Sequence, residues 1–222
     1  MRIRVFCLLV ASLLSASGAE IKFDFSEFPV DRPPPGFHGV VSGKGKPGDW
    51  NVIMDEVPPL LAPLTPQAPV VTRRAWRAQL SQDPTDERFP LLVCDGDTFG
   101  DFKLTTRFKI VSGGLEQMAG IAFRIQNETN FYVVRASTLG NNFRFYKVVN
   151  GERGDLIGPA VEIPKRVWHE LAIECKGNQI RCSLNGKELI PPLTDNTFAS
   201  GKIGYWTKSD AVSYFTDTII TY

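Results

Sequence analysis

Acidic side chains are the first candidates for chemistry in this sequence, because a pair of carboxyl groups can cleave a glycosidic bond. Glu170 and Glu174 alternate with apolar residues, so a strand would place both on one face. Their backbones would lie about 13 Å apart, whereas retaining glycosidases need carboxyl groups ~5 Å apart and inverting enzymes up to ~9.5 Å. The catalytic residues therefore stay unknown. A pair assembled from separate segments remains open for Asp97, Asp101, Glu116 and Asp210.

Residues that bind metals are few. The two histidines, His38 and His169, lie far apart with no ligand spacing around either, which argues against a transition-metal site. Asp95-Gly96-Asp97 is rich in oxygen atoms and suits either a calcium loop or a plain β-turn, the turn being the commoner use of such a sequence. We therefore expect no metal and no cofactor, with structural calcium as the alternative.

Three cysteines remain once the leader described below is removed, an odd number that cannot pair completely. Cys175 and Cys182 belong to one predicted hairpin and point to the same inward face, which favours packing over catalysis. Cys182 would be the diagonal neighbour of Cys175, about 5.5 to 8 Å away, which is marginal for a disulfide. A bridge and two buried thiols stay equally open.

The stretch from Trp168 to Gly186 indicates which elements position these groups. Apolar and polar residues alternate on both sides of a Lys-Gly-Asn turn, and Asn185-Gly186 forms a second turn. This pattern predicts an antiparallel hairpin with one apolar and one polar face. From Val70 onward similar segments follow at spacings of roughly 10 to 15 residues, and none has helical periodicity. The sequence therefore predicts an all-β sandwich or jelly roll.

The first 19 residues have the layout of a secretory signal peptide, with Arg2 and Arg4, an apolar run from Val5 to Leu14, and small residues at 17–19. We expect cleavage after Ala19 and a secreted or periplasmic protein, with a membrane anchor as the less favoured alternative because the apolar run is short. Loss of the two arginines changes the net charge of +1 by two units, to −1. Such a charge attracts neither nucleic acid nor an anionic membrane.

The remaining chain is long enough for one sandwich with a substantial core. Five prolines between Val57 and Pro69 predict an extended crossing. It is either a linker or a long loop around one sandwich, and we favour the loop because residues 20–56 are too few for a core of their own. We expect a single jelly-roll domain over 20–222, in which 20–98 extend a recognisable core at 99–222.

The order of the strand-like segments resembles a known superfamily. DFKLTTRFKI, GIAFRI, NFYVVRAS, NFRFYKV, WHELAIECKGNQIRCSLNGK and GKIGYWTKSDAVSYFTDTIIT follow one another as in the concanavalin A-like lectins and glucanases. Within that superfamily the chain looks like the bacterial secreted branch that includes 3-keto-disaccharide hydrolase domains and laminin G-like modules. The resemblance, over Phe99 to Tyr222, implies a concanavalin A-like jelly-roll sandwich of two antiparallel sheets with ligands on a concave face. The Glu-x-Asp-x-x-Glu motif of laminarinase-type enzymes is missing.

Alternation predicts which side chains face that groove. If Ile121, Phe123 and Ile125 fill the core, Arg124 and Gln126 point outward. The same reasoning for the later strands completes the candidate ligand-binding set: Arg124, Gln126, Arg135, Tyr146, Trp206 and Lys208. Such groups hold sugars by aromatic stacking and paired hydrogen bonds, although charged residues on strands are more often solvated cross-strand partners.

The function we favour is that of a secreted carbohydrate-binding, lectin-like protein, because the resemblance implies a saccharide groove and no acid or base can be named. The first alternative is a glycoside hydrolase or lyase of the 3-keto-disaccharide hydrolase type. The second is a structural cell-surface interaction module. The expected partner is a saccharide, with no nucleic acid and no membrane once the leader is removed; which saccharide and which oligomeric state are left open.

Overall fold

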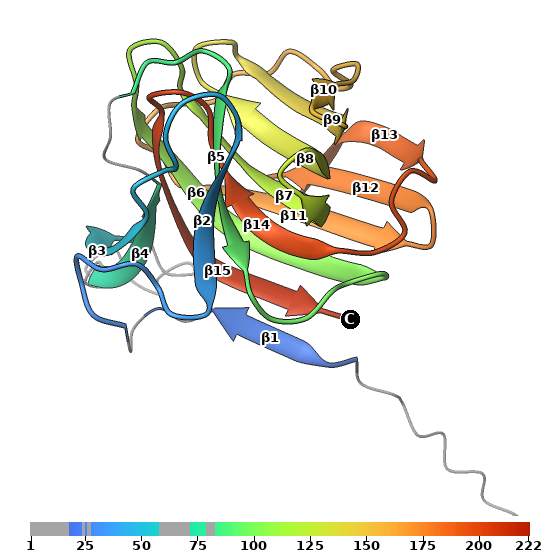
Figure 1. Ribbon diagram of the computed structural model, residues 1–222, viewed down its shortest axis with the longest axis horizontal. Helices are drawn as coiled ribbons and strands as arrows, with labels where there is room; N and C mark the ends of the chain where they lie inside the picture. The colour runs from blue at the N-terminus through green and yellow to red at the C-terminus, as the bar shows by residue number, and fades with distance from the viewer. Residues whose placement is uncertain (1–17, 24, 26–27, 58–71, 79–82) are drawn as a thin grey trace, which may run out of the picture.

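The chain forms two antiparallel β-sheets that pack face to face (Figure 1). The computed structural model describes residues 18–23, 25, 28–57, 72–78 and 83–222. The expected leader and the proline-rich crossing lie almost wholly outside these residues. The strands are β1 (Glu20–Phe23), β2 (Phe37–Gly43), β3 (Asn51–Glu56), β4 (Thr72–Ala78), β5 (Arg88–Cys94), β6 (Phe102–Ser112), β7 (Met118–Asn127), β8 (Asn130–Ser137), β9 (Asn142–Val149), β10 (Glu152–Arg153), β11 (His169–Lys176), β12 (Gln179–Leu184), β13 (Lys187–Thr194), β14 (Lys202–Trp206) and β15 (Val212–Thr221).

The strand order confirms the all-β, jelly-roll prediction. An eight-stranded sheet runs β13-β12-β11-β6-β15-β4-β3, with β1 also paired to β15, and a seven-stranded sheet runs β10-β9-β8-β7-β14-β5-β2. Residues before 99 supply β1, β3 and β4 to the first sheet and β2 and β5 to the second, so this segment is part of both layers. In the part of the chain that the structure describes, no helix is long and apolar enough to cross a membrane.

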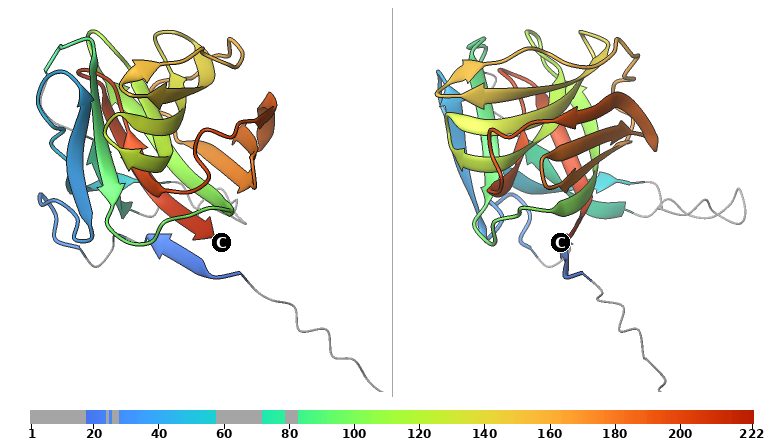
Figure 2. Two further views of the ribbon diagram at one scale, coloured as in Figure 1. Left: turned by 45° about the vertical axis from the view of Figure 1, so that its right-hand side comes forward. Right: turned by 90° about the vertical axis from the view of Figure 1, so that its right-hand side faces the viewer.

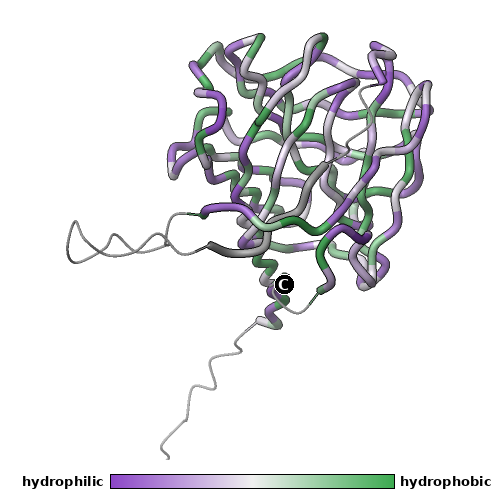
Figure 3. The backbone as a smooth tube through the Cα atoms, turned by 90° about the vertical axis from the view of Figure 1, so that its left-hand side faces the viewer, coloured by the Kyte–Doolittle hydropathy of each residue, from purple (hydrophilic) through white to green (hydrophobic). Residues whose placement is uncertain are grey.

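The core between the sheets follows the alternation of the sequence, which Figure 3 shows as changes of hydropathy along each strand. On β6, Phe102, Leu104, Phe108 and Ile110 are buried and the residues between them are more exposed, apart from the buried Thr106 within the apolar set. Apolar contacts of this kind are the main source of stability in a sandwich. The inward face of β6 therefore follows the two-residue period of a strand.

The hairpin predicted over 168–186 is formed by β11 and β12. Cys175 pairs with Ile180, and the intervening turn includes Gly177 at a φ of 55°, which glycine adopts at little cost. Cys175 and Cys182 are both buried in the core and both thiols are free. Burial raises the pKa of the Cys175 thiol to about 12, so this group serves packing and is unsuited to act as a nucleophile.

Arg124 departs from the alternation of β7. Its φ is 48°, and the register between β7 and β8 shifts between Phe123 and Asn127. This β-bulge adds a residue to one strand and reverses the faces beyond it. As a result Ile125 lies on the outer face and Arg124 points away from it. The expected outward Arg124 and inward Ile125 are therefore wrong.

The Arg124 guanidinium instead joins three loops at one end of the sandwich. Arg124 is only 1% exposed. It donates hydrogen bonds to the carbonyl oxygens of Phe198 (2.8 Å), Gly100 (2.9 Å) and Gly177 (2.7 Å). These carbonyls come from loops of both sheets, so one side chain satisfies backbone groups that would otherwise be unpaired.

Asp195 makes a similar link between the seven-stranded sheet and the loop before β14. Its carboxylate accepts hydrogen bonds from the Tyr132 hydroxyl (2.6 Å), the Lys147 ammonium (2.8 Å) and the Thr197 N–H (2.8 Å). Burial acts to raise the pKa of Asp195, but these hydrogen bonds outweigh it and hold the pKa well below its usual value. The ionised form is therefore stabilised by folding.

We expect the Asp195→Asn variant to lose part of the acid sensitivity of folding. Ionised Asp195 stabilises the wild type fully above its unfolded pKa of about 3.9, and this contribution disappears as pH falls through the lower folded pKa. Urea unfolding at a series of pH values should show the wild-type free energy of unfolding falling more steeply than that of the variant below about pH 5. Equal slopes for the two proteins would contradict the role given to Asp195.

Candidate functional site

The outer face of the seven-stranded sheet holds most of the side chains that the sequence predicted for ligand binding. Strand register places one row of residues across it: Leu91 on β5, Trp206 on β14, Gly120 on β7, Arg135 on β8 and Arg144 on β9. The residues that alternate with them, among them Val134, Phe145 and Tyr205, belong to the core between the sheets. The predicted orientations on β8, β9 and β14 are thereby confirmed.

Three aromatic rings meet at the centre of this face. Trp206 stacks on Phe89 with ring centroids 6.0 Å apart and meets the edge of Tyr146 at 6.3 Å. Trp206 is 1% exposed and Tyr146 is 3% exposed, within an apolar cluster that includes Leu91. Among the described residues, the Trp206 Nε1 finds no hydrogen-bond partner. The rings thus form the floor of the face, and the groups that reach solvent surround them.

Gly120 leaves room for Arg135 in this row. A Cβ atom at Gly120 would lie 2.6 Å from the Arg135 Cβ and 2.5 Å from the Val134 carbonyl oxygen. Both distances are shorter than atoms tolerate, and one neighbour is backbone that cannot move aside cheaply. Glycine therefore lets Trp206 and Arg135 flank the same position on adjacent strands.

The Gly120→Ala variant should be less stable than the wild type by about 1 to 3 kcal/mol, because the added methyl group overpacks a rigid sheet. Urea unfolding midpoints measure this directly. Gly96→Ala is the matched control: its Cβ would meet only the Cys94 Sγ at 3.6 Å, so its stability should stay within about 0.5 kcal/mol of wild type. Equal midpoints for both variants would contradict the packing described here.

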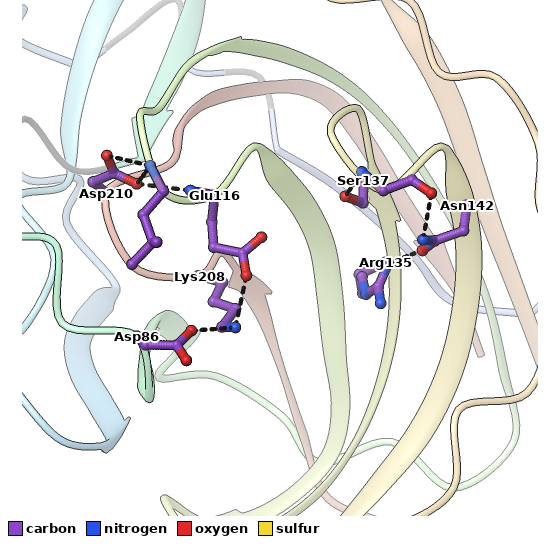
Figure 4. Close-up of polar contacts among 9 residues, drawn as sticks. Asp86, Glu116, Arg135, Ser137, Asn142, Lys208 and Asp210 are labelled. Atoms are coloured by element: carbon purple, nitrogen blue, oxygen red, sulfur yellow. Dashed lines mark hydrogen bonds and ion pairs between the residues drawn. The ribbon is translucent and has the colours of Figure 1, made fainter.

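Lys208 holds two carboxylates at the border of the face (Figure 4). Its Nζ lies 2.7 Å from Asp86 Oδ1 and 2.7 Å from Glu116 Oε1, so these two oxygens are separated by no more than twice that distance. Burial acts to lower the pKa of Lys208, but its hydrogen bonds to the two carboxylates outweigh this and raise it. The ammonium group therefore stays charged between the two carboxylates.

Asp210 fixes the turn that carries Glu116. Its carboxylate accepts hydrogen bonds from the backbone N–H groups of Gly114 (2.6 Å), Leu115 (3.0 Å) and Glu116 (2.9 Å). Burial acts to raise the pKa of Asp210, but these three donors lower it overall. A carboxylate bound to consecutive backbone amides is a rigid element, and this one positions Glu116 against Lys208.

Arg135 and Arg144 face each other directly across β8 and β9. Arg135 is 5% exposed, and its guanidinium donates a hydrogen bond to the Asn142 side-chain oxygen (Figure 4). Burial lowers the pKa of Arg135, and the charges of Arg144 and Arg153 act in the same direction, whereas Tyr146 and Glu116 act against it. Arginine groups of three strands therefore lie within electrostatic reach of one another.

The seven-stranded sheet is strongly curved (Figure 2). The pKa of Asp86 is lowered chiefly by its hydrogen bond to Lys208 and also by the charge of Arg153. Asp86 precedes β5, and four strands separate β5 from β10, which carries Arg153. A flat sheet would keep β5 and β10 ~24 Å apart, beyond the range of a screened interaction.

A pocket of about 240 Å³ lies elsewhere on the same face, beside the turn between β7 and β8. Its lining residues are His38, Val40, Leu91, Val93, Ile125, Gln126, Asn127, Glu128 and Lys202. Leu91 also neighbours Trp206 in the row described above, so the pocket and the aromatic floor are continuous. Gln126 is exposed at the pocket and donates a hydrogen bond to the Ser200 carbonyl.

Five of the six candidate residues thus share one face: Gln126, Arg135, Tyr146, Trp206 and Lys208. Arg124 is the exception. The sequence reasoning missed Asp86, Arg144 and Arg153 as candidates. Arg144 carried the same alternation signal as Tyr146, whereas Asp86 and Arg153 join the site only through the curvature of the sheet.

The other residues considered for chemistry lie elsewhere. Glu170 and Glu174 belong to β11 in the eight-stranded sheet, and Glu174 lines a separate hollow of about 520 Å³. Asp97 accepts a hydrogen bond from Tyr222, and the carbonyls of the Asp95-Gly96 turn accept from Lys202. No group of three or more His, Cys, Asp or Glu residues in the described ranges is arranged to hold a metal ion.

Comparisons with known proteins agree with this architecture. The sequence profile of the family described as 3-keto-alpha-glucoside-1,2-lyase-like domain matches residues 42–214. The carbohydrate binding module CBM66 from Bacillus subtilis has a TM-score of 0.57 at 18% identity, over 66% of this chain and 86% of that chain. The cellulose-induced protein Cip1 has a TM-score of 0.56 at 11% identity, over 90% of this chain and 96% of that chain.

A Bacillus subtilis protein of unknown function with a galectin-like fold has a TM-score of 0.52 at 13% identity, over 78% of this chain and 89% of that chain. At such identities these likenesses show the fold, a lectin-like jelly roll, and no more. No curated protein matches the sequence.

Proposed function

Because the chain belongs to the family of 3-keto-alpha-glucoside-1,2-lyase-like domains, we propose that it recognises a saccharide on the outer face of the seven-stranded sheet. The observation that carries this proposal is the gathering of charged groups around an aromatic floor on one curved face. Arg135, Arg144 and Lys208 surround Trp206 and Tyr146 there. Sugars present vicinal hydroxyl groups, which such planar and charged groups bind in pairs.

The geometry also indicates how a ligand would lie. The pocket beside Gln126 and the cluster around Lys208 share one continuous face through Leu91 and Trp206, so an oligosaccharide lying across the strands would contact both. Because the Trp206 ring is buried, hydrogen bonds from the surrounding polar groups supply most of the recognition. The fold shared with the carbohydrate binding module CBM66 supports a saccharide ligand.

A second candidate function, elimination from a 3-keto-glucoside, is favoured by the two carboxylates on Lys208. In that reaction Glu116 would take the proton from C2, and Lys208 would stabilise the charge that develops on the C3 carbonyl oxygen. The C1–O bond would break as the C1–C2 double bond forms, and protonated Glu116 would return its proton to the departing alcohol. The lyase-like family and the contact between Glu116 and Lys208 support this role.

Calorimetric titration of the purified chain with a panel of neutral and acidic oligosaccharides tests the binding proposal. We expect at least one panel member to bind, and uniformly null titrations would overturn the proposal. Incubation with 3-keto-glucosides tests the second candidate in parallel. Release of the aglycone would support catalysis, while binding without turnover would leave recognition as the function.

We also propose that the protein acts outside the cytoplasm, as a secreted or periplasmic protein, in keeping with the leader expected over residues 1–19. Saccharide recognition of this kind requires no cofactor, since side chains of the protein supply every contact named above. The saccharide is the only partner that the proposal requires.

A further inference from the structure

The arginine side chains on the outer face are arranged unfavourably for a protein without a ligand. Arg135 and Arg144 are directly opposed on adjacent strands, with both side chains on the same face. Like charges in this position destabilise a sheet. Arg153, opposite Val148 at the next strand, adds a third guanidinium that acts on Arg135. The fold therefore accepts a repulsion that substitution of one arginine would remove.

Neighbouring acidic groups relieve this repulsion only in part, because Glu116 acts against it at Arg135 and Asp86 interacts with the charge of Arg153. The two carboxylates nearby, Asp86 and Glu116, are both bound to Lys208. Arg135 uses the uncharged side chain of Asn142 as its partner, and the phenol of Tyr146 stays neutral because burial raises its pKa. Arg144 and Arg153 form no hydrogen bond or ion pair with another residue that the structure describes. The cluster thus holds four cationic side chains and two carboxylates: Arg135, Arg144, Arg153 and Lys208, with Asp86 and Glu116.

Resting on the proposed saccharide-binding function, we propose that the ligand is an acidic saccharide whose uronate carboxylate binds beside Arg144, above the buried Arg135, with Arg153 adding positive charge from the next strand. The positions fit this role. Arg144 is half-buried and Arg153 is exposed, so both can reach a ligand while Arg135 supports them from below.

A carboxylate fits this cluster better than a sugar hydroxyl. Guanidinium groups form two parallel hydrogen bonds with a planar carboxylate. The partly buried setting weakens solvent screening, which strengthens the interaction relative to a surface pair. The bound anion would also cancel the repulsion between the arginines, so binding would stabilise the folded protein.

Matched pairs of oligosaccharides test the inference. Oligomers of galacturonate, glucuronate and mannuronate are each titrated beside their methyl esters, which keep the hydroxyl groups and remove the charge. We expect at least one acid to bind about tenfold more tightly than its ester, with an advantage that shrinks at high salt. A sulfated oligosaccharide serves as a further arm, and tighter binding of sulfate than of every uronate would overturn the assignment of a carboxylate.

Arg144→Gln should abolish the roughly tenfold preference of acid over ester, and Arg153→Gln should reduce it by a smaller factor. Arg181→Gln is the matched control, because Arg181 pairs with Glu188 on the other sheet, and it should keep the wild-type preference. Thermal unfolding of the free variants shows whether they fold, and the two test variants should be at least as stable as the control because they relieve repulsion. Equal binding of acids and esters would overturn this inference alone, whereas no binding of any saccharide would overturn the proposed function as well.

Discussion

Replacement of Arg124 by methionine is expected to destabilise the protein by about 3 to 5 kcal/mol, an unusually large effect for one substitution. Methionine fills much of the same space but donates no hydrogen bond. The carbonyl groups of Gly100, Gly177 and Phe198 would lose their charged donor inside the protein, and each unpaired carbonyl costs free energy. Because these carbonyls belong to loops of both sheets, the damage would not stay local.

Urea unfolding followed by circular dichroism measures this effect. Arg181→Met is the control, since Arg181 makes a single exposed ion pair with Glu188 at 3.1 Å and such pairs contribute little. The loss of stability in Arg124→Lys should lie between the losses in Arg124→Met and Arg181→Met, because one ammonium group can reach fewer of the three carbonyls. A loss of less than about 1 kcal/mol for Arg124→Met would show that the three hydrogen bonds matter little to the fold.

The Lys208→Met variant is expected to lose saccharide affinity by about 10- to 100-fold, equivalent to ~1.4 to 2.7 kcal/mol of binding free energy. Lys208 holds Asp86 and Glu116 in place, and without its charge the two carboxylates repel each other and move apart. The ligand would lose both a cation and the acceptors that this cation orients.

Calorimetry with the saccharide that binds the wild type most tightly tests this prediction. Lys103→Met is the control, because Lys103 lies on β6 and lines the hollow on the other sheet. It should bind as the wild type does. Unchanged affinity of Lys208→Met would remove Lys208 and its two carboxylates from the site.

Alternation along strands was enough to predict most of the outer face. Because β8, β9 and β14 are regular, the burial of Tyr132 and Phe145 correctly placed Arg135 and Tyr146 on the opposite side. The same rule failed at Arg124, where a β-bulge shifts the register. The pattern of apolar residues does not indicate that bulge.

Contacts that depend on the shape of the whole sheet could not be predicted from the pattern of single strands. Asp86 and Arg153 come together only because the sheet curls, and its curvature is the sum of small twists over many strands. The strand β13 was also missed, since Pro191 and Pro192 argue against a strand. The strand β13 lies at the edge of the eight-stranded sheet. On an edge strand every second N–H group faces solvent, so a proline, which has no N–H group, is tolerated there.

Amide chemical-shift mapping during titration with the most tightly bound saccharide tests the central claim most directly. If the outer face of the seven-stranded sheet is the binding surface, the largest shifts will fall at Gly120, Arg135, Arg144 and Trp206, which form one row across four strands. Shifts confined to the hollow around Glu174 on the other sheet would contradict it.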